Sequence, residues 1–153
     1  MTEISLTEFA DRMMEIMPVM MREFARRQES ELFRSKITLP QFLILNLLHG
    51  LNEARMTELA KFMKVTTAAM TGIVDRLVRD GYVSRHYEPK DRRIIKIRLT
   101  PKGDKLVNKA NQERRQMLLN VFGKISGQDR RDYLRILTRI KDILTSETKG
   151  ENK

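Results

Sequence analysis

The sequence predicts a mainly α-helical protein with a small β-hairpin, in the element order α-α-α-α-β-β-α-α. Three observations predict this class. Apolar residues recur at helical spacing in both end regions, serine, threonine and proline mark the starts of those segments, and one central segment alternates apolar and polar residues. With 153 residues, 41% of them hydrophobic, the chain has about the length of one domain and enough apolar residues for a core.

The first two helices are predicted from local start and stop signals. Ser5, with a glutamate three residues later, forms a capping box, and the helix that begins there contains Pro18, which should bend it. A second helix opens at residues 38–41, where proline lies in the first turn, and Gly50 is expected to end it. Polar residues 52–55 are then expected to form a short connection.

The middle of the chain is predicted to hold two short helices and the hairpin. Helical spacing covers residues 56–63 and 68–79. Residues 82–87 and 94–99 alternate and are rich in β-branched and aromatic side chains, which is typical of strands. The charged segment 88–93 joins them, so the hairpin is expected to have a basic tip.

Two longer helices are predicted to follow. Thr100 is an N-cap followed by proline at the first helical position, and helical spacing continues to Phe122. Ser126 caps the last helix, and the polar sequence from residue 147 is expected to be a flexible tail. An apolar stripe of the last helix is expected to face inward: Tyr133, Leu134, Leu137, Ile140, Ile143 and Leu144.

Positive charge is concentrated in the middle of the chain. The sequence has 30 Lys and Arg against 20 Asp and Glu, a net charge of +10, and residues 55–102 hold 12 of the basic residues but only 5 of the acidic ones. Such a patch raises affinity for nucleic acid because binding releases counterions from the phosphates. The alternative is a solvated surface that only keeps the protein soluble.

The composition excludes several classes of site. Without cysteine there is no disulfide, thiolate nucleophile or cysteine-bound metal. No catalytic constellation, phosphate-cradling glycine loop or metal-ligand spacing is found, so we expect neither an enzyme nor a cofactor or metal. The apolar runs are shorter than a membrane span of about 18 residues, and an acid stands where a signal peptide has basic residues. We expect a soluble, cytoplasmic protein with no membrane partner.

Residues 59–73 have the spacing of a helix-turn-helix, although Lys64 replaces the usual turn glycine. Apolar or small residues fall where the two helices must bury each other: Leu59, Ala60, Met63, Val65, Met70 and Ile73. The second helix of such a motif can lie in the major groove, with its first residues at the base edges. The candidate contacts are Lys64, Thr66, Thr67, Ala68 and Thr71. Alternatively, these are ordinary small residues that pack two helices together.

The hairpin that follows carries Arg92 and Arg93 at its tip. A ribbon in this place can reach the neighbouring minor groove, whose negative potential attracts arginine. An acidic residue, Asp91, is unexpected in a loop that approaches DNA. Its presence is explained if it pairs with Arg93, or with Arg76 of the preceding helix, and fixes the direction of that guanidinium. Alternatively, the charged tip only discourages edge-to-edge strand pairing.

Four motifs along the chain form a recognisable pattern: Leu59-Ala60, Val74 to Leu77 with Gly81 to Val83 and Arg85, Asp91 to Arg93, and Leu99 to Gly103. Together they resemble the MarR family of winged-helix transcriptional regulators, over nearly the whole chain. The resemblance implies a homodimer with one winged helix-turn-helix in each subunit, which binds a promoter, usually as a repressor. It also implies that Thr66 to Thr71 and Arg76 face the major groove and its phosphates, and that Asp91 orients the wing-tip arginine, Arg93.

The resemblance implies three parts of the chain: a winged helix-turn-helix DNA-binding domain over residues 38–100, a helical dimerisation region over residues 1–37 and 101–146, and the tail over residues 147–153. The terminal helices carry apolar stripes that a domain of this size cannot cover alone, so we expect pairing about a two-fold axis. Two recognition helices about 34–36 Å apart then read a near-palindromic site.

The resemblance also implies release from the promoter by a small anionic or phenolic ligand, or by oxidation. Since the chain has no cysteine, thiol oxidation is excluded, and only two histidines argue against a histidine-rich metal sensor. By family analogy, a ligand cleft is expected between the terminal helices and the DNA-binding lobe. Its expected lining residues are Phe42, Leu45, His49 and Met63.

We therefore expect a sequence-specific regulator that binds double-stranded DNA as a homodimer on a pseudo-palindromic operator. Two alternatives stay open: a helical protein–protein adaptor that uses a basic surface, and a protein that coats DNA without sequence preference. The adaptor leaves the hairpin of Asp91 to Arg93 unexplained. Equal affinity for promoter and random duplex would identify the coating protein.

Overall fold

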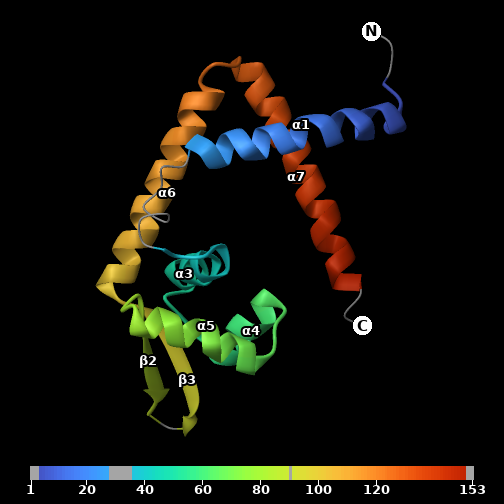
Figure 1. Ribbon diagram of the computed structural model, residues 1–153. Coiled ribbons are helices and arrows are strands. Elements are labelled where there is room, and N and C mark those ends of the chain that lie inside the picture. Colours follow the sequence, from blue (N-terminus) through green and yellow to red (C-terminus); the bar gives the residue numbers. More distant parts are fainter. Residues whose placement is uncertain (1–3, 28–35, 90, 151–153) are drawn as a thin grey trace. The chain divides into compact units, whose positions relative to one another are not determined.

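The computed structural model describes residues 4–27, 36–89 and 91–150, with only the backbone of Arg92 and of residues 147–150. The fold is mostly helical with a small antiparallel sheet (Figure 1). Within these ranges, no helix combines the length and the apolar character that crossing a membrane requires.

The chain divides into two compact units, residues 1–114 and 115–153. The first unit begins with α1 (Leu6–Arg27), where the backbone N–H of Glu8 donates a hydrogen bond to Oγ of Ser5 at 3.1 Å, which is one of the two hydrogen bonds of the predicted capping box. The carboxylate of Glu8 pairs instead with Arg12 at 2.7 Å. Pro18 lies inside α1, and none of the residues of this helix is buried within the described chain. Its large exposed apolar side chains are Leu6, Phe9, Met14, Ile16, Met17, Val19, Met20 and Met21.

The core of the first unit is built by α3 (Leu39–Leu51), α4 (Met56–Met63), α5 (Thr67–Arg79), the sheet and the beginning of α6 (Pro101–Phe122). Its largest fully buried side chains are Phe42, Ile44, Leu45, Leu48, Leu59, Met70, Val74, Leu77, Ile97 and Val107. Because Leu106, Val107 and Ala110 are buried, the first half of α6 is part of this core. The division between the two compact units falls inside α6. The expected DNA-binding domain over residues 38–100 stays a prediction.

The sheet contains a strand that the sequence did not predict. It has the order β1 (Glu53–Arg55), β3 (Asp91–Leu99), β2 (Val83–Glu88), with all pairs antiparallel. The connection expected at residues 52–55 is thus wrong: Ala54 pairs with Ile97 and is 3% exposed. Strand β3 also begins at Asp91, so the hairpin loop is shorter than expected, and a bulge lies between Tyr87 and Glu88.

Gly50 does not end its helix, contrary to the prediction. Helix α3 continues to Leu51, and the chain turns at Asn52, which has a φ of 66°. Asparagine tolerates positive φ better than most side chains, so it ends this helix without a glycine.

The Leu99–Gly103 motif joins the sheet, α5 and α6 at one point. The Oγ1 of Thr100 accepts a hydrogen bond from the backbone N–H of Gly103 (3.2 Å) and donates one to the carbonyl of Gly81 (2.6 Å). A Cβ on Gly103 would lie 2.1 Å from the carbonyl oxygen of Tyr82, so only glycine fits this close approach. The end of α5 is thereby held against the start of α6.

The second unit is a helical hairpin formed by the end of α6 and by α7 (Gly127–Gly150). The guanidinium of Arg130 donates hydrogen bonds to the carbonyls of Phe122 (3.0 Å) and Ile125 (2.8 Å), which satisfies the end of α6. The apolar stripe of α7, expected to face inward, is exposed within the described chain, from 39% at Tyr133 to 63% at Leu134. The ring of Tyr133 packs against that of Phe122 of α6, with 5.3 Å between the ring centroids, and the rest of the stripe stays exposed. Helix α7 continues to Gly150, past the residue 147 at which a tail was expected.

Candidate nucleic-acid interface

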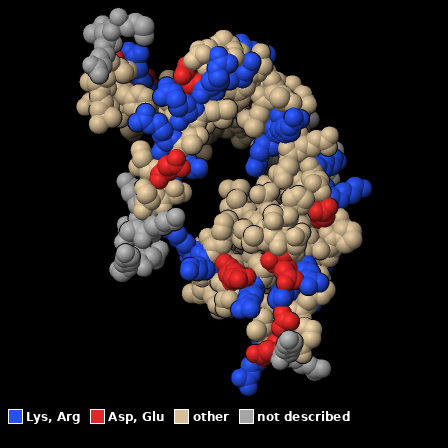
Figure 2. All heavy atoms as spheres, turned by 180° about the vertical axis from the view of Figure 1, so that it is seen from behind, with Lys and Arg blue, Asp and Glu red and all other residues tan. Residues whose placement is uncertain are grey.

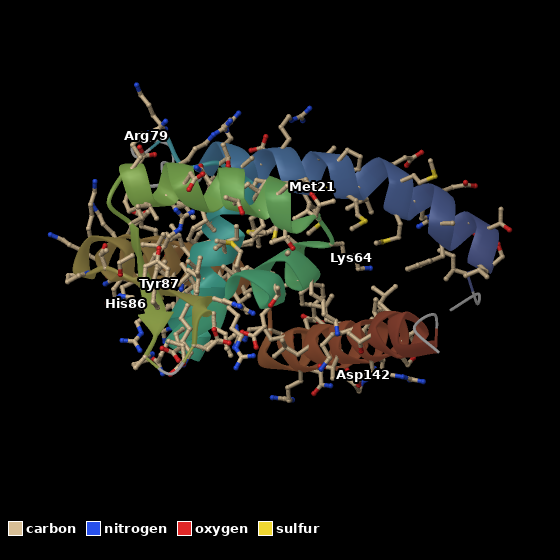
Figure 3. The ribbon with its side chains drawn as sticks, turned by 90° about the horizontal axis from the view of Figure 1, so that it is seen from below. Met21, Lys64, Arg79, His86, Tyr87 and Asp142 are labelled. Atoms are coloured by element: carbon tan, nitrogen blue, oxygen red, sulfur yellow. The ribbon has the colours of Figure 1, made fainter. Side chains whose placement is uncertain are left out.

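Helices α4 and α5 form the predicted helix-turn-helix. Leu59 and Ala60 of α4 are buried, as is Met70 of α5. Lys64 ends α4 in the left-handed conformation, with a φ of 52°, where glycine is the residue that fits without strain. Figure 3 shows Lys64 at the turn that precedes α5 and Arg79 at the opposite end of that helix. Met63 and Ile73 are half-buried, whereas Val65 is exposed.

The first turn of α5 presents small side chains to solvent. Thr66 is the N-cap, and its Oγ1 accepts a hydrogen bond from the backbone N–H of Ala69 at 3.2 Å. Thr67 and Ala68 are exposed, and Thr71 is half-buried and donates its hydroxyl proton to the carbonyl of Thr67 at 2.8 Å. Short side chains therefore form the exposed surface at the start of α5.

The wing tip is shaped by Asp91. Its Oδ1 accepts a hydrogen bond from the backbone N–H of Arg93 at 3.0 Å, so the contact fixes the backbone rather than the expected guanidinium of Arg93 or Arg76. The side chains of Arg93 and Arg76 are exposed. The predicted contact through the Arg92 side chain lies outside the described residues.

A cavity of about 440 Å³ lies between the helix-turn-helix and the hairpin. Its lining comes from the start of α4, from α5 and from the hairpin: Arg55, Met56, Thr57, Thr67, Thr71, Arg85, Arg93, Ile94 and Ile95. It brings together three of the predicted contact residues, Thr67, Thr71 and Arg93. The start of α5 and the wing arginine thus border one concave surface.

Arg85 is a site residue whose role the sequence did not indicate. It lies opposite the buried Ile97 in the sheet and forms an ion pair with Asp75 of α5. Its Nε is buried and has no hydrogen-bond partner among the described residues. The sequence feature that could have revealed this role is the alternation of strand β2. It places residue 85 on the core side of the sheet, where an arginine requires a carboxylate partner.

The outer face of the sheet carries a second set of charges that the sequence did not assign. Lys96 of β3 lies 2.8 Å from Glu53 of β1 and 2.8 Å from Glu88 of β2, and Arg98 lies 2.6 Å from Glu53. Hydrogen bonds from Lys96 and Arg98 hold the pKa of Glu53 below its usual value. Hydrogen bonds to Glu53 and Glu88 raise the pKa of Lys96 above its usual value. Part of the basic patch is therefore paired internally.

The four residues expected to line a ligand cleft do not line the 440 Å³ cavity. Phe42 and Leu45 are in the core, 2% and 0% exposed, and the half-buried Met63 packs against it. Nδ1 of His49 lies 3.0 Å from Oδ1 of Asp104, which links α3 to α6. The residues described around the 440 Å³ cavity do not include these four.

Residues 37–95 match the model of the MarR family. The chain is 30% identical over 114 residues to YhbI of Bacillus subtilis, an uncharacterized HTH-type transcriptional regulator, which covers 74% of this chain and 71% of the relative. It is 46% identical over 88 residues to YetL of the same organism, an HTH-type transcriptional repressor, which covers 56% of this chain and 48% of that one. With two further regulators, the chain spans 63% and 64% of the relatives' length.

A solved structure with a similar fold is that of Streptococcus pneumoniae FabT in complex with DNA. The TM-score is 0.76 at 18% sequence identity, over 93% of this chain and 99% of that one. At this identity the likeness concerns the fold, a winged helix. The matched family model, the 30% identity to a relative over most of its length and the shared fold show that this chain belongs to the MarR family, a family of transcriptional regulators and not of enzymes.

Proposed function

We propose that this protein is a sequence-specific, double-stranded DNA-binding transcriptional repressor that acts as a homodimer on a pseudo-palindromic operator. The observation that carries the proposal is the shared surface of α5 and the wing. Thr67 and Thr71 of α5 and Arg93 of the hairpin border the same cavity, so one ligand can contact both the helix and the wing tip. The repressor YetL and the DNA complex of FabT are consistent with this function.

The chemistry of this surface suits B-form DNA. Helix α5 presents short side chains at its start, which allow the backbone to approach base edges in the major groove. Lys64 and Arg76, both exposed, are suited to the flanking phosphates. The exposed Arg93 is suited to the adjacent minor groove.

The apolar surfaces of the terminal helices support the homodimer. Helix α1 has no buried residue within the described chain, and the apolar stripe of α7 is exposed. Surfaces of this kind mark protein interfaces, and a second copy can cover both. A two-fold axis then sets two α5 helices about one DNA turn apart.

A small anionic or phenolic effector forms part of the proposal. The 440 Å³ cavity supports it, because Arg85 and Arg93 line it and guanidinium groups attract anions. A ligand bound there would occupy the surface that α5 and the wing present to DNA. The alternative lining, Phe42, Leu45, His49 and Met63, requires the core to open, since Phe42 and Leu45 are buried.

Selection of bound duplexes from a random pool tests the proposed function. We expect a two-fold symmetric site, bound about 10³ or more times more tightly than random duplex, with affinity that falls steeply with salt. Arg93→Ala should weaken binding strongly because a guanidinium in the minor groove is lost. Arg139→Ala, on the exposed surface of α7, serves as the control and should hardly change it.

Three results contradict parts of this proposal. Equal affinity for selected and random duplex favours a protein that coats DNA without sequence preference. Absence of any duplex binding favours the protein–protein adaptor. Equal effects of Arg93→Ala and Arg139→Ala indicate that diffuse charge, rather than the wing, holds the duplex.

A further inference from the structure

The outer face of the sheet carries four side chains of alternating charge, here called the charge clamp: Arg98, Glu53, Lys96 and Glu88. Both Nε and a terminal nitrogen of Arg98 contact Oε2 of Glu53, at 2.7 and 2.6 Å. Lys96 contacts the other carboxylate oxygen of Glu53 and Oε2 of Glu88, each at 2.8 Å. Figure 2 shows acidic and basic side chains interspersed over this part of the molecule, seen from behind.

The clamp lies on the face of the sheet that is turned away from the core. Ile97 is fully buried and Ile95 packs against the core, so the alternation of β3 places Lys96 and Arg98 on the opposite face. The residues that line the cavity bordered by Thr67, Thr71 and Arg93 do not include any of the four clamp residues. The clamp is therefore not part of the lining of the surface proposed to contact DNA.

Lys96 joins the two strands that flank β3. Glu88 is the last residue of β2, at the bulge where the hairpin turns into the wing tip. Glu53 opens β1, which leads directly into α4 through Arg55, the N-cap of that helix. The ammonium group thus connects the base of the wing to the strand that precedes the helix-turn-helix.

The four charges of the clamp balance one another. The side chain of Lys96 is 25% exposed and those of its two carboxylate partners are 31% and 29% exposed, so all three are largely covered. A lysine that is bonded to two carboxylates does not offer a free charge to a phosphate. Its place in the basic patch therefore needs another explanation.

We propose that Lys96 is a positioning residue for DNA binding: by holding Glu53 and Glu88 together, it fixes the wing relative to the helix-turn-helix and does not itself contact the duplex. This inference rests on the proposed function. A wing held in one orientation binds without first losing conformational freedom, which favours affinity.

The sign of one substitution separates this role from simple electrostatics. Glu88→Gln removes a negative charge, so electrostatics alone predicts tighter binding to DNA. The clamp predicts weaker binding to the selected duplex, by about threefold to tenfold, because the wing is released. Asp142→Asn makes the same chemical change at an exposed ion pair on α7 and should leave affinity unchanged.

Lys96→Met should weaken binding by a similar factor, and the double variant with Glu88→Gln should bind no worse than Lys96→Met alone, because both remove one interaction. Lys96→Arg, which can still bond two carboxylates, should retain affinity. The dependence of log affinity on log salt should keep its slope in Lys96→Met and fall by about 1 in Arg93→Ala, because the Arg93 guanidinium in the minor groove displaces a counterion of the duplex and the clamped Lys96 does not. Tighter binding by Glu88→Gln, or an equal loss of slope in Lys96→Met and Arg93→Ala, overturns the proposal.

Hydrogen exchange of the free protein tests the clamp without DNA. Backbone amides of residues 88–95 should exchange faster in Lys96→Met than in the wild type, and at unchanged rates in Arg93→Ala. Thermal unfolding checks that each variant is folded. Unchanged exchange in Lys96→Met refutes the clamp. If Lys96→Met exchanges faster but the wild-type protein binds no duplex, the proposed function is refuted and the holding role of Lys96 stands.

Discussion

Lys64 combines an unfavourable backbone conformation with an exposed cation. It ends α4 with a φ of 52° and a ψ of 43°, a left-handed conformation that costs side chains with a Cβ about 1 kcal/mol or more. Its side chain is exposed at the turn that precedes α5. A lysine at this position supplies a cation beside the proposed phosphate path, which a glycine cannot do.

Lys64→Gly should therefore raise the free energy of unfolding by about 0.5–1 kcal/mol and weaken duplex binding. Urea denaturation and a binding titration measure the two effects. Lys61→Gly, the same change at an exposed position inside α4, should instead lower stability by about 1 kcal/mol. A loss of stability in both variants would show that Lys64 is not strained.

At the scale of elements, local signals predicted most helices. Helices α4 and α6 have the predicted bounds because their caps, prolines and apolar spacing lie within the segments themselves. Strand β1 has no such signal, since Glu53 to Arg55 becomes a strand only by pairing with residues 96–98. The candidate site divides in the same way.

The exposed arginine Arg93 was predicted from a local motif of the hairpin. The N-cap Thr66 was not, since the helix was expected from residue 68 and begins at Thr67. The ion pair of Asp75 with Arg85 and the position of Lys96 between two carboxylates could not be predicted. A single sequence does not reveal which acid on one element faces which base on another.

The junction at Gly103 leads to a prediction about two glycines. Gly103→Ala should lower the free energy of unfolding by about 2 kcal/mol or more, because its Cβ would meet the carbonyl oxygen of Tyr82 at 2.1 Å and backbone must move. Gly50→Ala, inside α3 with no described atom within 4 Å of the added Cβ, should raise it by about 0.5–1 kcal/mol. Chemical denaturation of both variants measures the difference, and a tolerated Gly103→Ala would contradict the close approach.

At the scale of the whole molecule, the terminal helices carry most of the large exposed apolar side chains of the described residues. Exposed large apolar side chains concentrate on α1 and α7 of the described chain, whereas the core of the winged helix is closed. The excess positive charge lies instead in the middle segment, residues 55–102, where the charge clamp neutralises part of it. The proposed homodimer and the proposed DNA contact would therefore use separate surfaces.

Ile140→Asp, on the exposed stripe of α7, should convert the protein to single subunits, because a charge in an apolar interface is costly. Affinity for the selected duplex should fall by orders of magnitude, since only one half-site can then be held. Sedimentation equilibrium measures the mass, with Arg139→Ala as the neighbouring control. A dimeric Ile140→Asp would exclude this stripe from the interface.

The cap of α5 has a consequence for the bases that the protein can distinguish. Thr71 donates its proton to its own helix and Thr66 accepts one there, so part of the hydrogen-bonding capacity of these hydroxyls is already used, while the methyl groups of Thr66, Thr67 and Ala68 stay exposed to the groove. The methyl group of thymine is the base feature that such a surface recognises. The half-sites recovered by selection should accordingly be rich in A·T pairs where α5 begins, and discrimination there should depend on shape and apolar contact more than on hydrogen bonds.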